Sequence, residues 1–147
     1  MRRTPSGEFE LEVPAVEAIG LFTPEGERPW ARGWDPVYRE GEPSEAPGTV
    51  FTTAVGGSHT IWVIVEIDRP AGTAVYVRVT PGSHAGTVRV RCLGASASRT
   101  VVSVSYDMSL LDGGDPADLD AFDETPFDAT MNDWATAIAT HLGSHPR

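Results

Sequence analysis

Metal coordination is the first chemistry that the spacing of polar residues suggests. His141 and His145 stand four residues apart near the C-terminus, a spacing that brings two imidazoles to one face of a helix. Gly143 and Pro146 interrupt that helix, and no cysteine or carboxylate close in sequence completes a ligand set. His84 falls near a strand end, where we expect it to face solvent. The histidine spacing therefore predicts no metal site.

A run of carboxylates between Asp112 and Asp133 is the second candidate cation site. An EF-hand loop needs oxygen ligands at alternating positions and a glycine at the sixth. Counted from Asp112, the third and fifth residues are Gly114 and Pro116, so the motif fails. The acidic residues are typical of a solvated helix face, and we expect no bound cation.

Nucleophilic and cofactor chemistry leave few traces in the sequence. The single cysteine, Cys92, lies in a strand-like run (residues 87–93), which favours a buried, small apolar side chain over a reactive thiol. The chain has no Gly-x-Ser-x-Gly, no phosphate-binding loop and no dinucleotide fingerprint. We therefore expect no cofactor and assign no catalytic residue.

Tyr106 and Arg78 are the residues most able to handle a polar ligand group. Tyr106 is a phenol among apolar positions, and a buried hydroxyl needs a partner in a ligand or in the protein. Alternation along the strand expected at 73–80 places Arg78 on the polar face, where we expect it to pair with Glu66. If the register is shifted by one residue, Tyr76 and Arg78 point inward instead, and the ligand would be anionic.

Composition limits the possible functions. The chain has 147 residues, 40% of them hydrophobic, which is enough for one domain with a real core. A net charge of −10 disfavours nucleic-acid binding. No run approaches the roughly 20 apolar residues that span a membrane. One cysteine allows no internal disulfide, so we expect a cytoplasmic protein. We also expect a monomer or a homodimer.

The elements that must position these residues are mostly strands. An alternating run at residues 8–13 predicts a first strand, followed by a short helical segment at 15–22 after Pro14. Residues 1–6 are expected to form a loose tail. Further strands are expected at 35–39, 49–55, 59–68, 73–80, 87–93 and 100–110. Short connections rich in Gly, Pro and Ser favour an antiparallel meander.

Alternation predicts which side of each strand faces the core. The predicted inner residues are Ile61, Val63, Val65 and Ile67; Val75, Val77 and Val79; Val88, Val90 and Cys92; and Val102, Val104 and Tyr106. One face of the sheet is thus apolar and needs a cover.

The last element can supply that cover. Apolar residues recur at helical spacing from Phe127 through Met131, Trp134 and Ile138 to Leu142. We expect Thr125 to cap this helix, Pro126 to occupy its first turn and Gly143 to end it. One or two helical turns are expected just before it, within 117–122.

The order of elements resembles the helix-grip fold of the SRPBCC superfamily. That group includes START-like lipid-transfer domains, birch-pollen-allergen proteins and polyketide cyclases. The matching segments are residues 22–36 (with Pro-Glu-Gly, Trp and Gly-Trp-Asp-Pro), 48–51, 61–63, 76–82 and 100–106, together with Trp134 and Ile138 in the last helix. The resemblance spans residues 8–143, so we expect one domain over 1–147 with its folded core there.

The resemblance implies an α+β helix-grip fold, in which a curved antiparallel sheet wraps around the C-terminal helix and two short helices follow the first strand. It also implies a cavity for a small hydrophobic or amphipathic ligand: a lipid, a polyketide or an aromatic metabolite. The alternatives are a polyketide cyclase or aromatase and a partner-binding module like the chaperone activators of the group. The expected ligand-binding residues are Trp30, Trp34, Tyr38, Phe51, Val63, Val77, Val90, Tyr106, Met131 and Trp134.

Overall fold

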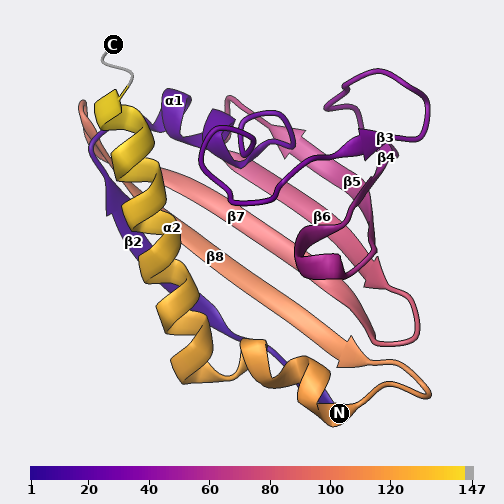
Figure 1. Ribbon diagram of the computed structural model, residues 1–147. Coiled ribbons are helices and arrows are strands. Elements are labelled where there is room, and N and C mark those ends of the chain that lie inside the picture. The colour runs from indigo at the N-terminus through magenta and orange to yellow at the C-terminus, as the bar shows by residue number, and fades with distance from the viewer. Residues whose placement is uncertain (145–147) are drawn as a thin grey trace.

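The computed structural model of the protein describes residues 1–144. A curved antiparallel sheet wraps around the long C-terminal helix α2 (Glu124–Ser144) (Figure 1). The strand order is β1-β8-β7-β6-β5-β4-β3, and β2 also pairs with β8. The strands are β1 (Arg2–Arg3), β2 (Ser6–Leu11), β3 (Val37–Tyr38), β4 (Val50–Thr53), β5 (Thr60–Asp68), β6 (Thr73–Thr80), β7 (His84–Ser96) and β8 (Arg99–Leu110). The predicted fold class is therefore confirmed.

Short helices fill the connections. The expected helical segment after Pro14 is present as α1 (Ala15–Ala18) and the 3-10 turn η1 (Ile19–Phe22). A second 3-10 turn, η2 (Val55–Gly57), follows β4. The turns expected before the last helix form η3 (Pro116–Phe122), which is capped by the Asp115 side chain through the backbone N–H of Ala117.

The predicted loose tail is wrong. β1 and β2 are two stretches of one edge, both paired with β8. Between them Pro5 lacks an N–H for the ladder, but its carbonyl accepts a hydrogen bond from the N–H of Tyr106 at 2.9 Å. The N-terminal residues are therefore part of the sheet.

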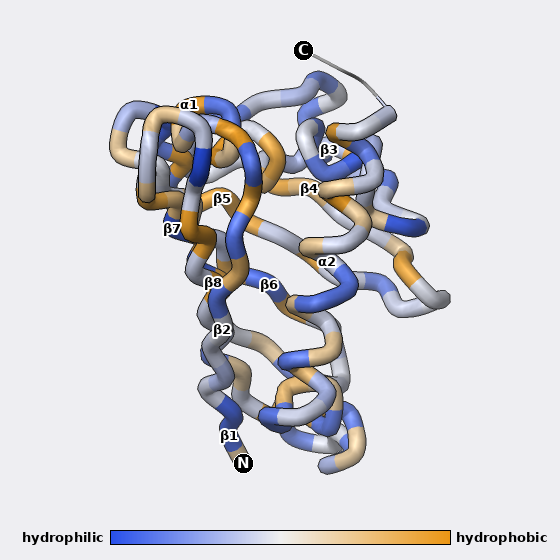
Figure 2. Tube along the Cα trace, turned by 90° about the vertical axis from the view of Figure 1, so that its left-hand side faces the viewer, coloured by the Kyte–Doolittle hydropathy of each residue, from blue (hydrophilic) through white to orange (hydrophobic). Residues whose placement is uncertain are grey.

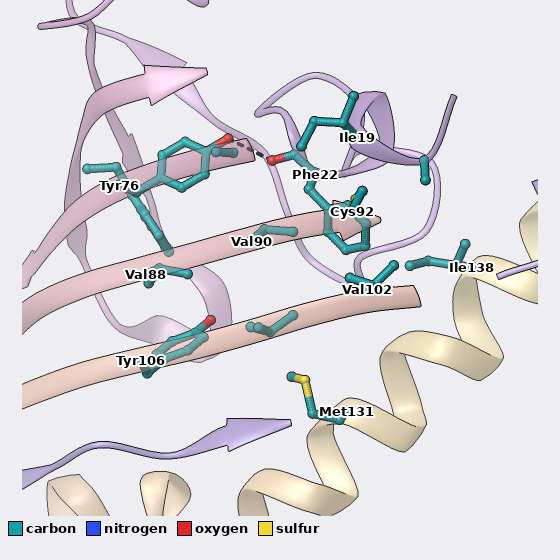
Figure 3. Close-up of a cluster of buried hydrophobic side chains, with 14 of the residues drawn as sticks. Ile19, Phe22, Tyr76, Val88, Val90, Cys92, Val102, Tyr106, Met131 and Ile138 are labelled. Atoms are coloured by element: carbon teal, nitrogen blue, oxygen red, sulfur yellow. Dashed lines mark hydrogen bonds between the residues drawn. The ribbon is translucent and has the colours of Figure 1, made fainter. Parts of the chain in front are cut away.

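The inner face of β7 and β8 is the predicted one. Val88, Val90 and Cys92 are buried on β7, and Val102, Val104 and Tyr106 are buried on β8. Figure 3 shows side chains from both strands pointing toward α2, where Met131 and Ile138 meet them.

The predicted faces of β5 and β6 are wrong at most positions. Trp62 pairs with Arg78, and Ile64 pairs with Tyr76, which is only 3% exposed. These residues share the inner face, so Val63 and Val77 lie on the outer face. The other predicted inner residues on the outer face are Ile61, Val65, Val75 and Val79.

Two local features explain this error. The pairing of β5 shifts between Ile64 and Glu66, and such a bulge reverses the alternation of sides, so Ile67 packs on the core as predicted. On β6, the hydroxyl of the inward Tyr76 donates a hydrogen bond to the carbonyl of Phe22 at 2.6 Å (Figure 3). The valines of β6 could pack equally well on either face of the sheet, so alternation alone assigned them to the wrong face.

Helix α2 covers the sheet with the predicted residues. Phe127, Met131 and Ile138 are buried, whereas Trp134 is only partly buried. The helix begins one residue before the predicted cap and continues through Gly143 to Ser144. Hydrophilic and hydrophobic residues alternate along its turns (Figure 2). No helix in residues 1–144 is long and apolar enough to cross a membrane.

Candidate functional site: an aromatic cavity between sheet and helix

A cavity of about 840 Å³ opens between the inner face of the sheet, α2 and the segment that follows η1. The sheet contributes Thr53, Thr60, Trp62, Arg78 and Tyr106 to its wall. The rest of the lining is Glu27, Trp30, Ala31, Arg32, Trp34, Val55, Ser58, Thr130, Asp133, Trp134 and Ala137. The predicted space between helix and sheet is therefore present.

The indole N–H groups of Trp30 and Trp34 are bound by the protein itself. Trp30 donates to the carbonyl of Leu21 at 2.9 Å, and Trp34 donates to the carbonyl of Pro24 at 2.8 Å. These bonds fix the segment 23–34 and orient its two rings. With their polar atoms satisfied, the rings offer the cavity mainly apolar and π surface.

The tryptophans pack edge to face across the cavity wall. Trp30 and Trp134 have centroids 5.6 Å apart, and Trp34 and Trp62 are 5.4 Å apart. All four tryptophans of the chain therefore line one space. Such a wall suits a flat aromatic ligand, because it offers both edges and faces for contact.

Arg78 introduces a positive charge into this aromatic wall. Its guanidinium carbon lies 4.9 Å from the centroid of the Trp62 ring, within cation–π range. Its Nε is buried and has no hydrogen-bond partner within residues 1–144. The expected surface pair with Glu66 is wrong, because Arg78 lies on the inner face opposite Trp62, whereas Glu66 lies opposite Val75 on the outer face. Burial raises the pKa of the Tyr106 phenol, and the charge of Arg78 partly opposes that rise.

Glu27 lies where the cavity narrows to an inner recess of about 20 Å³. Desolvation by its surroundings raises the pKa of its carboxyl well above the usual range. The wall of the recess is otherwise aromatic and aliphatic: Phe22, Trp34, Trp62, Tyr76, Val88, Val90, Tyr106 and Trp134. Glu27 is thus the one charged residue that lines the recess.

A tight turn before Glu27 determines its position. The Thr23 hydroxyl donates to the carbonyl of Gly20 and accepts from the N–H of Gly26, both at 3.0 Å. A Cβ at Gly26 would lie 1.7 Å from the Gly20 carbonyl oxygen, so only glycine allows this close approach. Backbone N–H groups of Trp30 and Ala31 then bond to the Glu27 carbonyl, which begins a helical turn.

His84 forms a second buried polar group near Arg78, outside the cavity lining. It is 8% exposed rather than solvated as expected, and its Nε2 has no partner within the described residues. Its Nδ1 bonds the Ser83 hydroxyl at 2.7 Å, and that hydroxyl donates to Asp118. Burial lowers the pKa of His84, and the charge of Arg78 adds to this effect.

The predicted site residues divide into three groups. Trp30, Trp34, Tyr106 and Trp134 line the cavity, and Val90 lines the recess. Tyr38, Phe51 and Met131 are buried in the core outside the lining; Phe51 stacks on Trp62, and the Tyr38 hydroxyl donates to Glu25. Val63 and Val77 lie on the outer face, which corrects their predicted role.

Sequence reasoning missed Glu27 and Trp62 and placed Arg78 on the wrong face. The spacing of Glu27 and Trp30, three residues apart, was a usable signal, because a helical turn puts such residues on one side. The position of Arg78 depended on the register of β6, which the sequence left open.

Metal and thiol chemistry receive no support from the geometry. Among residues 1–144 no cluster of His, Cys, Asp and Glu could hold a metal ion, and His145 lies outside the described residues. Burial raises the pKa of the Cys92 thiol to about 12. This thiol is therefore almost entirely protonated at neutral pH.

Solved structures share this architecture at low sequence identity. Norcoclaurine synthase from Thalictrum flavum, solved with dopamine and hydroxybenzaldehyde, matches with a TM-score of 0.69 at 11% identity, over 100% of this chain and 90% of that one. Ara h 8.0201 matches with a TM-score of 0.70 at 16% identity, over 99% of this chain and 100% of that one. The di-domain ARO/CYC protein BexL of the BE-7585A biosynthetic pathway matches with a TM-score of 0.67 at 17% identity, over 98% of this chain and 48% of that one.

Sequence comparisons add no closer relative: no protein-family model matches, and no curated protein sequence matches. Identities of this size establish the fold and leave the ligand open. The topology, the wrapped helix and the solved structures agree with the sequence motifs. The chain therefore has the helix-grip fold that it shares with these solved structures.

Proposed function

We propose that the protein binds a small amphipathic ligand with an aromatic body in the cavity between the sheet and α2. The ligand places a hydrogen-bond acceptor, such as a carboxylate, phenolate or carbonyl oxygen, against Arg78. The observation that supports this most is the position of the Arg78 guanidinium, which lines the cavity beside Trp62 and has no carboxylate partner in residues 1–144. A cation in an aromatic wall favours an anionic or strongly polar acceptor on the ligand.

The size and wall of the cavity support the same assignment. About 840 Å³ lies within the ordinary range for small-molecule sites, about 300–1,000 Å³. Four tryptophans favour an aromatic ligand over a plain lipid chain, because they offer edge and face contacts beyond apolar area. The norcoclaurine synthase structure, with its two small aromatic compounds, is a solved example of this use of the fold.

A titration with 2-naphthoate, followed by tryptophan fluorescence, tests the proposal. Arg78→Met removes the guanidinium and keeps much of the side-chain volume. Arg89→Met is the matched control, because Arg89 is exposed on the outer face of β7. A hydrogen bond to a charged group contributes about 1.5–3 kcal/mol, so Arg78→Met should weaken binding by at least about tenfold.

Each result of this titration has a stated meaning. Arg89→Met should bind 2-naphthoate as the parent protein does. Binding by Arg78→Met at the parental affinity would contradict the role given to Arg78. No binding of 2-naphthoate to the parent protein would contradict an acceptor site for aromatic ligands.

A cyclase or aromatase activity is the second candidate, favoured by the presence of Tyr106, Arg78 and Glu27 on one cavity. A phenol and a carboxyl of raised pKa can both transfer protons when a reactive chain is held between them. The ARO/CYC protein BexL shows the fold in that role. Aldol cyclisation of a model aromatic β-diketone by the parent protein, lost in Tyr106→Phe with 2-naphthoate binding retained, would support it. Absence of turnover would leave binding as the function.

A further inference from the structure

The inner recess differs in charge from the rest of the cavity. Arg78, Arg32 and Asp133 line the large cavity but not the recess, where Glu27 is the single charged group. Within residues 1–144 the Glu27 carboxyl has neither a hydrogen bond nor an ion pair, and desolvation is the sole cause of its shifted pKa. A carboxyl in an aromatic recess without a partner calls for a donor or a cation.

Extending the proposed function, on which this inference rests, we propose that the recess binds a primary ammonium group, so that the ligand is an aromatic primary amine. The ammonium donates to the Glu27 carboxylate and lies against the rings of the recess. The aromatic body then occupies the cavity between the tryptophans, and its acceptor group reaches Arg78.

The aromatic wall favours a cation over a neutral group. Trp34, Trp62 and Trp134 line the recess, together with the rings of Phe22, Tyr76 and Tyr106. A cation over a Trp face gains about 2 kcal/mol or more when the site is desolvated. Glu27 adds an opposite charge at the same place. A neutral hydroxyl group would use neither contribution fully.

The volume restricts the cation to a small one. About 20 Å³ holds one group of the size of a water molecule, and a buried water needs two to four polar partners. The Tyr76 hydroxyl is already bonded to Phe22 and the Tyr106 hydroxyl interacts with Arg78, which leaves Glu27 as the main acceptor. An ammonium can donate to Glu27 and use the rings for its remaining surface. A trimethylammonium group is too large for the recess.

The charges around Glu27 determine how binding depends on pH. Tyr76 on β6 and Tyr106 on β8 face it as neutral phenols, Arg78 is on β6, Asp133 is on α2 and Arg32 is on the same loop. Glu27 itself has a raised pKa in the free protein. An ammonium stabilises the ionised carboxylate, so binding releases a proton from Glu27. The affinity for an amine therefore rises with pH until Glu27 is ionised in the free protein as well.

The net charge of the protein acts in the same direction. With −10 on the whole chain, a cationic ligand is attracted from solution. Arg78 balances the acceptor end of the ligand and does not line the recess. A ligand with an amine at one end and an acceptor at the other fits both charges.

The experiment compares 3-phenylpropylamine with 3-phenylpropan-1-ol, two probes of similar shape that differ in charge. Tryptophan fluorescence gives both affinities. The parent protein should bind the amine about ten to thirty times more tightly than the alcohol. Glu27→Gln should abolish this preference and retain the affinity for the alcohol. Glu66→Gln is the matched control, because Glu66 is exposed and lines neither the cavity nor the recess, and it should leave the preference unchanged.

Two further readouts separate a charge effect from a loss of shape. Amine affinity should rise with pH in the parent protein and be flat in Glu27→Gln, while alcohol affinity should be flat in both. The N,N,N-trimethyl derivative of the amine should bind more weakly than the primary amine. A preference for this derivative, or an amine preference that survives in Glu27→Gln, would overturn the inference.

Failure of the inference and failure of the proposed function give different results. Equal binding of amine and alcohol overturns the ammonium site and leaves an aromatic cavity site intact. Binding of neither probe, together with no binding of 2-naphthoate, overturns both. Loss of the preference in Asp133→Asn rather than in Glu27→Gln would place the amine at the cavity mouth and refute the recess.

Discussion

Trp134 and Ile138 lie one turn apart on α2, and their truncation to alanine separates the cavity wall from the core. Ile138 is 0% exposed, whereas Trp134 is partly buried and lines the cavity. Residue size alone ranks Trp134 as the more costly loss, at about 3–5 kcal/mol for a fully buried ring. The structure reverses that order.

The expected magnitudes follow from what each side chain contacts. Ile138→Ala removes three buried carbon groups, about 2.4 kcal/mol at about 0.8 kcal/mol each. The void left behind raises the total to about 3–4 kcal/mol. Trp134→Ala loses two ring contacts, with Trp30 at 5.6 Å and Phe22 at 6.4 Å. Ring contacts contribute about 0.5–1.5 kcal/mol each beyond the area that the rings bury. With roughly 1 kcal/mol more for the buried part of the ring, the expected loss is about 3 kcal/mol, since the new space joins an existing cavity.

Urea unfolding followed by far-UV circular dichroism measures both losses without relying on tryptophan fluorescence. Ile and Trp have similar helix propensities, so the gain from alanine cancels in the comparison. We expect Ile138→Ala to have the lower unfolding midpoint and Trp134→Ala to lose affinity for 2-naphthoate more strongly. A Trp134→Ala loss of about 4 kcal/mol or more, with 2-naphthoate affinity unchanged, would refute the argument, because it would make Trp134 a core residue.

Three other predictions concern Glu27, two glycines and Cys92. Because the pKa of Glu27 is raised above the 4.5 of a free carboxyl, the unfolded chain releases this proton first, and stability falls as pH rises from about 4.5 toward the folded pKa. Glu27→Gln should therefore be more stable than the parent at about pH 8 and no more stable at about pH 4. Equal stability differences between variant and parent at the two pH values, measured by urea unfolding, would contradict this. Gly26→Ala should destabilise by about 1–3 kcal/mol, because its Cβ meets the Gly20 carbonyl. Gly143→Ala should stabilise the protein by about 0.5–1 kcal/mol, because the added Cβ meets open space in α2. If the unfolding midpoints of Gly26→Ala and Gly143→Ala moved in the same direction, the tight turn would be contradicted. The Cys92 thiol, with a pKa of about 12, should react slowly with a disulfide reagent in the native protein and readily in urea; fast native reaction would show that it is accessible.

Local pattern was sufficient where only one arrangement buries apolar side chains. Apolar spacing on α2 placed Phe127, Met131 and Ile138 in the core, and alternation on β7 and β8 gave the observed inner face. The motif around residues 22–36 predicted the segment that carries Trp30 and Trp34 to the cavity. The cover of the sheet followed from the same reasoning, because an apolar face needs a partner.

Local pattern failed where a sequence is apolar on both sides or where polar atoms find distant partners. The phase of β5 and β6 depends on a bulge after Ile64 and on the Tyr76 hydroxyl reaching Phe22, which is 54 residues away. The Glu27 carboxyl and the Arg78 Nε have no partner in residues 1–144, a property that no spacing reveals. Residue pattern alone was enough to predict the sheet, the helix that covers it and the tryptophans near their meeting point. Which charged groups face the cavity depends on the pairing of the strands in three dimensions, because a one-residue shift in pairing moves every side chain of a strand to the opposite face.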